Sequence, residues 1–268
     1  METFKTIITE HFEWRNQILK LAKADIIKTY SGAALGWAWA IVKPTITIAV
    51  FWFAFTVGLR GGGDVEGYPF ALWMIPGFVA WFYMSDMLNQ GVSAIRKYRY
   101  LVTKMKFPVS TIPTFVGLSK LAIHVVLLAI TVCIFIATGH YPDLYWLQVF
   151  IYMFLMVWFW IAWGLFSSML GAMSNDFVNL IKSISTAVFW MSGIMWDVNT
   201  IDIAWIQKIL YFNPVTYIAT GYRNCFIYKT WIWEEPMQFW IYIAMLIIMI
   251  ILGAWSYRKL IKEIPDVL

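Results

Sequence analysis

The sequence predicts an all-α polytopic membrane protein. Two segments, residues 144–175 and 236–257, contain no Asp, Glu, Lys or Arg. About 20 apolar residues suffice to span the ~30 Å hydrocarbon core of a bilayer. Hydrophobic residues make up 61% of the 268-residue chain and charged residues only 13%, whereas soluble domains typically carry about 25% charged residues. Membrane spans use up nearly the whole length, so we expect one transmembrane domain over residues 1–268.

Taken in order, the spans are separated by turn-forming residues. We expect six transmembrane helices, over residues 35–59, 68–94, 109–137, 145–172, 177–196 and 237–257. Three glycines at 61–63 interrupt the chain after the first span, and Ser174 supplies an N-cap for the fifth. In the fourth span, Gly164 with Ser168 and Ser167 with Gly171 have a small-xxx-small spacing that lets helices approach closely.

Positive charges indicate the topology. They gather in the N-terminal segment, between the second and third spans, and at the C-terminus: Lys5, Arg15, Lys20, Lys23 and Lys28; Arg96, Lys97, Arg99, Lys104 and Lys106; Arg258, Lys259 and Lys262. The loop after the first span has only Arg60, and the loop after the third has none. Because positive charge accumulates on the cytoplasmic side, we expect both termini to be cytoplasmic. The net charge of +5 then reflects topology rather than a nucleic-acid partner.

Two segments outside these spans are also expected to be helical. From Phe12 to Tyr30, apolar residues alternate with cations at loose helical spacing, which is typical of an amphipathic helix in the membrane interface; a solvated extension of the first span is the alternative. Residues 201–226 are too apolar for a solvated loop, and Asn213-Pro214 divides them into two pieces too short to cross a bilayer. We expect a re-entrant helical hairpin before the last span, with a hairpin lying on the membrane surface as the alternative.

The loop after the second span mixes cations with bulky apolar side chains. Topology accounts for its five cations but not for Tyr98, Tyr100 and Leu101 beside them. A short cytoplasmic helix over residues 95–107 that docks on a partner protein would use both kinds of side chain.

Ionisable residues inside spans are costly and therefore candidates for function. Lys43 and Asp86 each lie about eight residues, or ~12 Å, from the cytoplasmic end of their spans. Lys120 and His124 are four residues apart and share a helix face. These four side chains either join helices or line a cavity for an anionic substrate.

No catalytic signature is present. The phosphate-loop pattern G-x-x-x-x-G-K-[ST] is absent, His11, His124 and His140 are scattered, and Cys133 and Cys225 are too few for a disulfide framework. We expect no metal, no bound cofactor and no enzymatic activity by the chain alone. An intramembrane enzyme or a secondary transporter would require an acid/base cluster or internal repeats. The 17 Trp, 14 Tyr and 20 Phe are typical of interfacial belts, although some could line a glycan path.

Several segments resemble polysaccharide-exporting ABC permeases of the ABC-2 type, and within that group the wall teichoic acid translocation permeases. The resembling segments are residues 28–39 with Lys43-Pro44, 58–74, 104–114, 139–142, Asn213-Pro214 and 221–224. The chain differs at Asn175-Asp176, where many such permeases carry Arg-Asp.

This resemblance implies a homodimer that works with two separate ATPase subunits, which would bind ATP and Mg. It also implies export of an undecaprenyl-diphosphate-linked teichoic acid across the cytoplasmic membrane of a Gram-positive bacterium, with capsule or O-antigen export as the alternative. The implied contacts to the ATPase are Arg15, Lys20, Lys23, Arg96, Lys97, Tyr98, Arg99 and Tyr100. The implied external gate is residues 201–226, with Phe212, Asn213, Pro214, Tyr222 and Arg223.

Overall fold

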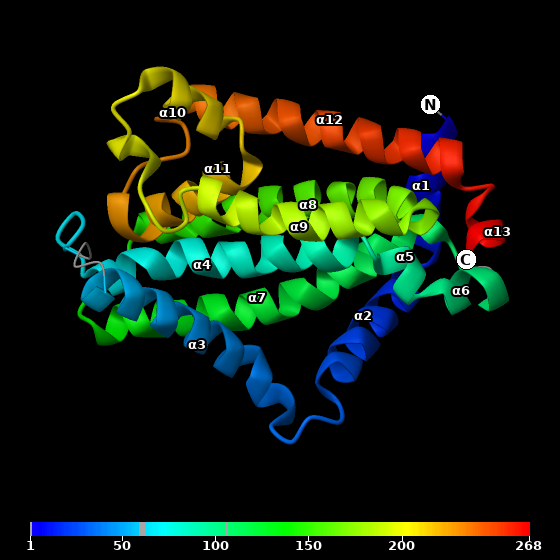
Figure 1. The fold of residues 1–268 in the computed structure, drawn as a ribbon, viewed down its shortest axis with the longest axis horizontal. Coiled ribbons are helices and arrows are strands. Elements are labelled where there is room, and N and C mark those ends of the chain that lie inside the picture. The colour runs from blue at the N-terminus through cyan, green and yellow to red at the C-terminus, as the bar shows by residue number, and fades with distance from the viewer. Residues whose placement is uncertain (1, 59–62, 106) are drawn as a thin grey trace.

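The computed structural model describes residues 2–58, 63–105 and 107–268, and this part of the chain is almost entirely helical (Figure 1). Its α-helices are α1 (Glu2–Glu13), α2 (Arg15–Tyr30), α3 (Trp39–Phe53), α4 (Phe70–Asp86), α5 (Ala94–Lys97), α6 (Arg99–Met105), α7 (Ile112–Ala137), α8 (Val149–Met173), α9 (Asn175–Met191), α10 (Ala204–Tyr211), α11 (Pro214–Arg223), α12 (Pro236–Leu260) and α13 (Ile264–Val267). The all-α class is confirmed. Arg60 and Lys106, two of the cations that indicate the topology, lie outside the described residues.

Helices α3, α4, α7, α8, α9 and α12 run along the length of the bundle (Figure 1). Within the described residues, five segments are long and apolar enough to cross a membrane: Gly36–Gly58, Phe70–Gly91, Val109–Ala137, Leu144–Met173 and Pro236–Leu260. The fifth predicted span, residues 177–196, corresponds to α9, which has only 17 residues and is about 25 Å long. It starts where the Ser174 hydroxyl accepts a hydrogen bond from the Phe177 amide, as the sequence predicts. It ends at Met191, five residues earlier than predicted.

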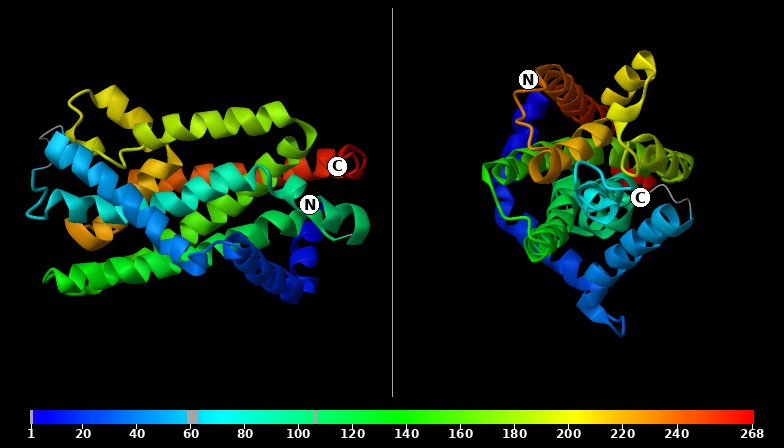
Figure 2. Two further views of the ribbon diagram at one scale, coloured as in Figure 1. Left: turned by 60° about the horizontal axis from the view of Figure 1, so that its bottom comes forward. Right: turned by 90° about the vertical axis from the view of Figure 1, so that its left-hand side faces the viewer.

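Both termini lie at the same end of the bundle (Figures 1 and 2). A chain that returns to the end where it started must traverse the bundle an even number of times. The short helix α9 is therefore one of these traverses. Helices α1, α2, α5, α6 and α13 also gather at this end, here called the terminal end. It therefore carries all three segments rich in Lys and Arg.

The N-terminal helix α1 is an element that the sequence analysis did not predict. The Glu10 carboxylate accepts hydrogen bonds from Tyr257 at the end of α12, at 2.8 Å, and from Ser110 before α7. These bonds hold α1 across the terminal end.

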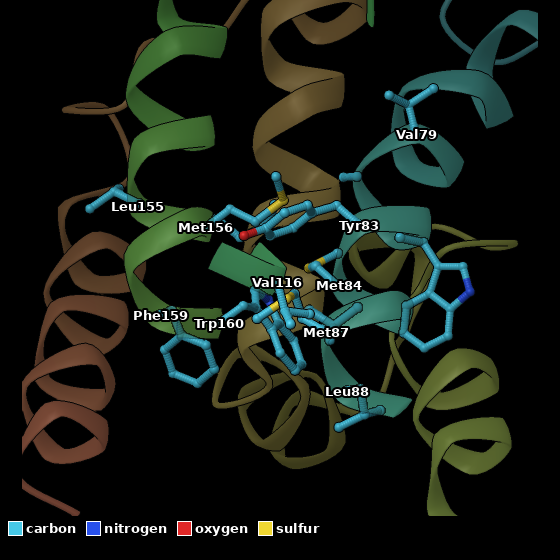
Figure 3. Close-up of a cluster of buried hydrophobic side chains, with 14 of the residues drawn as sticks. Val79, Tyr83, Met84, Met87, Leu88, Val116, Leu155, Met156, Phe159 and Trp160 are labelled. Carbon is cyan, nitrogen blue, oxygen red and sulfur yellow. The ribbon is translucent and has the colours of Figure 1, made fainter. Parts of the chain in front are cut away.

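The core is centred on α4, which is apolar on all sides. Met74, Phe78, Met84 and the following Met87 are completely buried, as is typical of a helix surrounded by other helices. Figure 3 shows Tyr83 reaching from α4 toward Met156 of α8.

The predicted close packing of α8 is confirmed at Gly171. A Cβ atom at this glycine would lie 2.1 Å from the Val92 carbonyl oxygen. Only a residue without a side chain permits this approach, which brings α8 against the turn that follows α4.

The segment between α9 and α12 forms two short helices, as predicted, at the end opposite the termini (Figure 1). Helix α11 packs against α4 inside the bundle and is buried from Val215 to Arg223. The Asn213 side chain caps α11 by accepting a hydrogen bond from the Val215 amide at 3.0 Å, and Pro214 occupies the first helical turn, where its missing N–H costs nothing. Re-entry into a bilayer stays a prediction.

Residues 95–107 do not form one continuous helix. The chain bends at Tyr98, which separates α5 from α6. At Tyr98 the backbone leaves helical geometry, and its side chain is buried in the protein.

Candidate functional site

A polar cavity lies inside the bundle toward the terminal end, where α3 diverges from α4 and α7 (Figure 1). Its volume is about 440 Å³. The four predicted intramembrane residues Lys43, Asp86, Lys120 and His124 all line it, although they come from three separate helices. The end of α2 closes one side through Thr29 and Tyr30.

Lys120 and Asp86 form the ion pair of the cavity. The Lys120 ammonium lies 3.7 Å from a carboxylate oxygen of Asp86, and the two side chains are 3% and 44% exposed. In the described part of the chain, Lys43 forms no ion pair with Asp86 within 4 Å, but it lines the same space. The cavity thus holds two ammonium groups and one carboxylate.

His124 connects three helices. Its Nδ1 lies 3.2 Å from the Val79 carbonyl oxygen of α4, and its Nε2 lies 2.8 Å from the Tyr222 hydroxyl of α11. A carbonyl can only accept, so Nδ1 carries a proton, and in the neutral ring Nε2 accepts from Tyr222. His124 thereby joins the cavity wall to the predicted gate segment.

The five predicted gate residues have different surroundings. Phe212 is 59% exposed, and Asn213, which caps α11, also donates to the Ser192 hydroxyl at 2.8 Å. Tyr222 is fully buried against His124. Pro214 lines a separate apolar cavity between α8, α9 and α12.

Arg223 points into the protein rather than toward a path. Its guanidinium donates to the carbonyl oxygens of Gly193 and Ile194 and lies 3.6 Å from the centre of the Trp73 ring. A Cβ atom at Gly77 would lie 2.8 Å from this guanidinium, so the glycine makes room for it. Arg223 therefore fixes α11 to α4.

The eight predicted partner-contacting side chains all lie at the terminal end but differ in accessibility. Arg15, Lys20, Lys23, Lys97, Arg99 and Tyr100 are exposed, and these six are available to a partner.

Arg96 and Tyr98 are turned toward the protein. Arg96 donates to the Ala172 carbonyl oxygen at 2.9 Å and to the Asn175 side-chain oxygen. The Asn175 side chain thus serves as an acceptor for Arg96. Tyr98 is buried and packs edge-on against Phe115.

Asp25 is a residue that the sequence analysis missed. It is 2% exposed and joins three elements: Lys97 at the end of α5 donates to it at 2.8 Å, the neighbouring Tyr98 hydroxyl donates to the same oxygen, and Ser119 of α7 donates to the other. The sequence carries a signal for it, because Asp25 lies on the helix face of Ile18 and Ala22, which are also buried.

The surroundings of Asp25 favour its ionised form. Burial alone would raise its pKa, but the hydrogen bonds from Lys97, Ser119 and Tyr98 outweigh burial and lower the pKa below its ordinary value. Asp25 is therefore a charged link between α2, the α5–α6 bend and α7, which lines the cavity.

Many aromatic side chains within the bundle pack on one another. Phe51 of α3 lies 5.5 Å from Phe78 and 5.3 Å from Phe189, measured between ring centroids. These contacts join α3, α4 and α9. In the described residues, no group of three His, Cys, Asp or Glu side chains is placed to hold a metal ion.

Comparisons with known proteins cover most of the chain. The model of a family described as ABC-2 type transporter matches residues 16–227, from the start of α2 to the turn after α11, and so includes the whole cavity. A curated relative, the O-antigen export system permease protein RfbA of Myxococcus xanthus, is 24% identical over 221 residues, which cover 82% of this chain and 84% of that protein.

Proposed function

Because the chain belongs to the ABC-2 type transporter family, we propose that it is the permease subunit of an ATP-driven exporter of lipid-linked polysaccharide. In this proposal a homodimer of the chain forms the membrane path, and separate ATPase subunits that bind ATP and Mg contact its terminal end. Both termini face the cytoplasm, in the cytoplasmic membrane. The chain itself performs no chemistry.

The observation that carries this proposal is the polar cavity. Ionisable side chains within a membrane are costly unless a partner or a function compensates them. Lys43 and Lys120 outnumber the one carboxylate in the cavity, so it is suited to an anionic group such as the diphosphate that joins a glycan to its lipid. The cavity also lies on the side where the exposed cations of α2 and α6 would meet a cytoplasmic motor.

Two cargoes have specific support. The resemblance of residues 58–74 and 104–114 to teichoic acid permeases favours a lipid-linked wall teichoic acid and a Gram-positive host. The relative named as an O-antigen export permease favours O-antigen. Both are glycans that a lipid diphosphate can carry.

Reconstitution tests the proposal directly. The chain is placed in liposomes with and without a stand-alone ABC ATPase from the same cell, and translocation of a fluorescent lipid-diphosphate glycan is followed by its accessibility to an external quencher. We expect ATP-dependent translocation only with both subunits, for a teichoic acid precursor or an O-antigen precursor. ATP hydrolysis or translocation by the chain alone would refute the assignment as a permease without a motor.

A neutralised cavity provides the second arm of this test. The double variant Lys43→Gln, Lys120→Gln is expected to lower translocation at least about tenfold, because each lost ammonium removes a charge-assisted hydrogen bond. Lys208→Gln on the exposed face of α10 is the matched control. Equal translocation by the wild type, the double variant and Lys208→Gln would show that the cavity lysines do not bind the cargo.

A further inference from the structure

Helix α9 differs in character from one side to another. One face packs into the bundle and carries Val178, Ile181, Ser185 and Phe189. A second face is exposed and apolar, and its larger members are Leu180, Ile184 and Met191, which are 53%, 43% and 59% exposed. Exposed apolar side chains on a membrane-spanning helix are typical of a surface in contact with lipid.

The third face of α9 is exposed as well, but it is polar. This polar face consists of Asn179, Lys182, Ser183 and Thr186. Spacings of three and four residues place the four side chains on one side of the helix. The Ser183 hydroxyl donates to the Asn179 carbonyl oxygen of the same helix at 2.9 Å. Within the part of the chain that the structure describes, the Lys182 ammonium forms no ion pair within 4 Å.

The polar face lies deep in the membrane. Lys182 and Thr186 are the eighth and twelfth residues of α9, which puts them about 10 Å and about 16 Å along a helix of about 25 Å. Hydrocarbon cannot pair amide, hydroxyl and ammonium groups, so ionisable side chains at such depth face a protein or a water-filled space. The apolar and polar faces of α9 therefore meet two different environments at the same depth.

Polar side chains lead from the cavity to α9. Helix α4 lies between α9 and α3 (Figure 1). In the turn after α4, Gln90 lines the cavity, and its neighbour Asn89 donates to the Ser185 hydroxyl of α9 at 2.9 Å. On the polar side of α9, Trp190 contacts Phe51 of α3, with ring centroids 6.0 Å apart. The polar face is thus turned toward α3, on the side where the cavity lies.

Aromatic rings end this polar surface toward the opposite end of the bundle. The Phe189 ring lies 5.3 Å from Phe51 of α3, 5.4 Å from Trp81 of α4 and 5.4 Å from Trp190, measured between centroids. Helices α3, α4 and α9 meet at these rings. The polar face therefore occupies the part of α9 between the terminal end and this aromatic contact.

We propose that the polar face of α9 lines a water-filled passage and that Lys182 selects anionic polymers that move through it. The Lys182 ammonium is suited to phosphate or carboxylate groups on a glycan. The amide and hydroxyl groups of Asn179, Ser183 and Thr186 both donate and accept, as sugar hydroxyls require. The polymer as cargo rests on the proposed function, whereas the passage rests on the contrast between the two exposed faces of α9.

Thiol modification tests the passage without any ATPase. The chain carries Cys133→Ala and Cys225→Ala, is placed in nanodiscs, and receives single cysteines on α9. Ser183→Cys and Thr186→Cys lie on the polar face, and Ile184→Cys and Ala187→Cys are matched controls at the same depth on the apolar face. A charged, membrane-impermeant methanethiosulfonate is added, and mass spectrometry measures the modified fraction over time. Monodisperse elution confirms that each variant is folded.

We expect modification at least about tenfold faster at positions 183 and 186 than at 184 and 187, because the reacting thiolate forms only in contact with water. Equal rates on the two faces would overturn the proposal. Slow reaction at all four positions would show that the polar face packs against protein without water.

Export of matched glycans tests the role of Lys182. The reconstituted complex receives two cargoes on the same lipid and of equal length, one bearing phosphate groups and one neutral. Lys182→Glu should lower the ratio of anionic to neutral export at least about tenfold, because like charges then meet in the passage, and Lys182→Gln should give an intermediate ratio. Lys262→Glu, at an exposed lysine after α12, should leave the ratio unchanged. An unaltered ratio in both Lys182 variants would refute charge selection.

The passage and the proposed function fail in different ways. Unmodified cysteines on the polar face together with intact ATP-driven export would reject the passage alone. Rapid modification of the polar face together with no export of either glycan by the wild type would reject the exporter and leave the water-filled passage standing.

Discussion

Replacing Asp25 should destabilise the terminal end more than replacing any exposed acid. Asp25→Ala removes the acceptor of three hydrogen bonds. Ser119 keeps a second acceptor, the Val116 carbonyl oxygen at 3.0 Å, and Lys97 is 35% exposed, so its ammonium can turn to water. The Tyr98 hydroxyl is buried and loses its acceptor. Since a hydrogen bond to a charged group contributes about 1.5–3 kcal/mol, we expect a loss of about 3 kcal/mol in all.

The assay is equilibrium unfolding of the purified chain in detergent, followed by tryptophan fluorescence. Asp25→Asn keeps the shape of the side chain but removes its charge. It should lower the free energy of unfolding by about half as much as Asp25→Ala, because one amide oxygen remains to accept hydrogen bonds. Glu13→Ala, at an exposed acid in the same region, should change stability by no more than about 0.5 kcal/mol. If Asp25→Ala is as stable as Glu13→Ala, the carboxylate does not join α2 to α5 and α7.

Three further predictions concern pH, helix packing and the cap of α11. The pKa of Asp25 is lowered in the folded protein from an ordinary value of 3.8. The contribution of its carboxylate to the free energy of unfolding is therefore complete above about pH 4 and is lost as the pH falls through the folded pKa. Asp25→Asn should accordingly flatten the acid limb of a stability–pH curve. Gly171→Val should abolish monodisperse expression, because its side chain would overlap the Val92 carbonyl oxygen, whereas Gly139→Val, in an open turn, should remain soluble in detergent although strained. Asn213→Ala should cost about 1 kcal/mol in thermal unfolding through loss of the α11 cap; no change would show that Pro214 alone starts the helix.

The features that the sequence predicts well are those that depend on local pattern or on depth. Spans without charge are recognised from composition alone. Lys43 and Asp86 meet in one cavity because equal distance from a helix end means equal depth in a bundle. The Ser174 cap and the Gly171 contact also follow from short spacings, because residue type and position along one helix decide them.

The features that it does not predict depend on which helices become neighbours. Arg223 is typical of an exposed or gating cation, yet it is buried because Trp73 and Gly77 on α4 leave a space of its shape. Tyr98 turns inward because Asp25, 73 residues earlier, supplies an acceptor. No periodicity within α5 or α11 contains this information, since the partners come from distant parts of the chain.

Three residues of α7, all between positions 119 and 124, contact three different parts of the protein. Ser119 donates to Asp25 of α2, Lys120 lies 3.7 Å from Asp86 of α4, and His124 is hydrogen-bonded to Tyr222 of α11. We therefore expect a displacement of α2 at the terminal end to reach the hairpin of α10 and α11 through α7, unless the Asp25–Ser119 hydrogen bond breaks. The contacts thus form a continuous route from the terminal end of the bundle to the opposite end, and that route passes along the wall of the cavity.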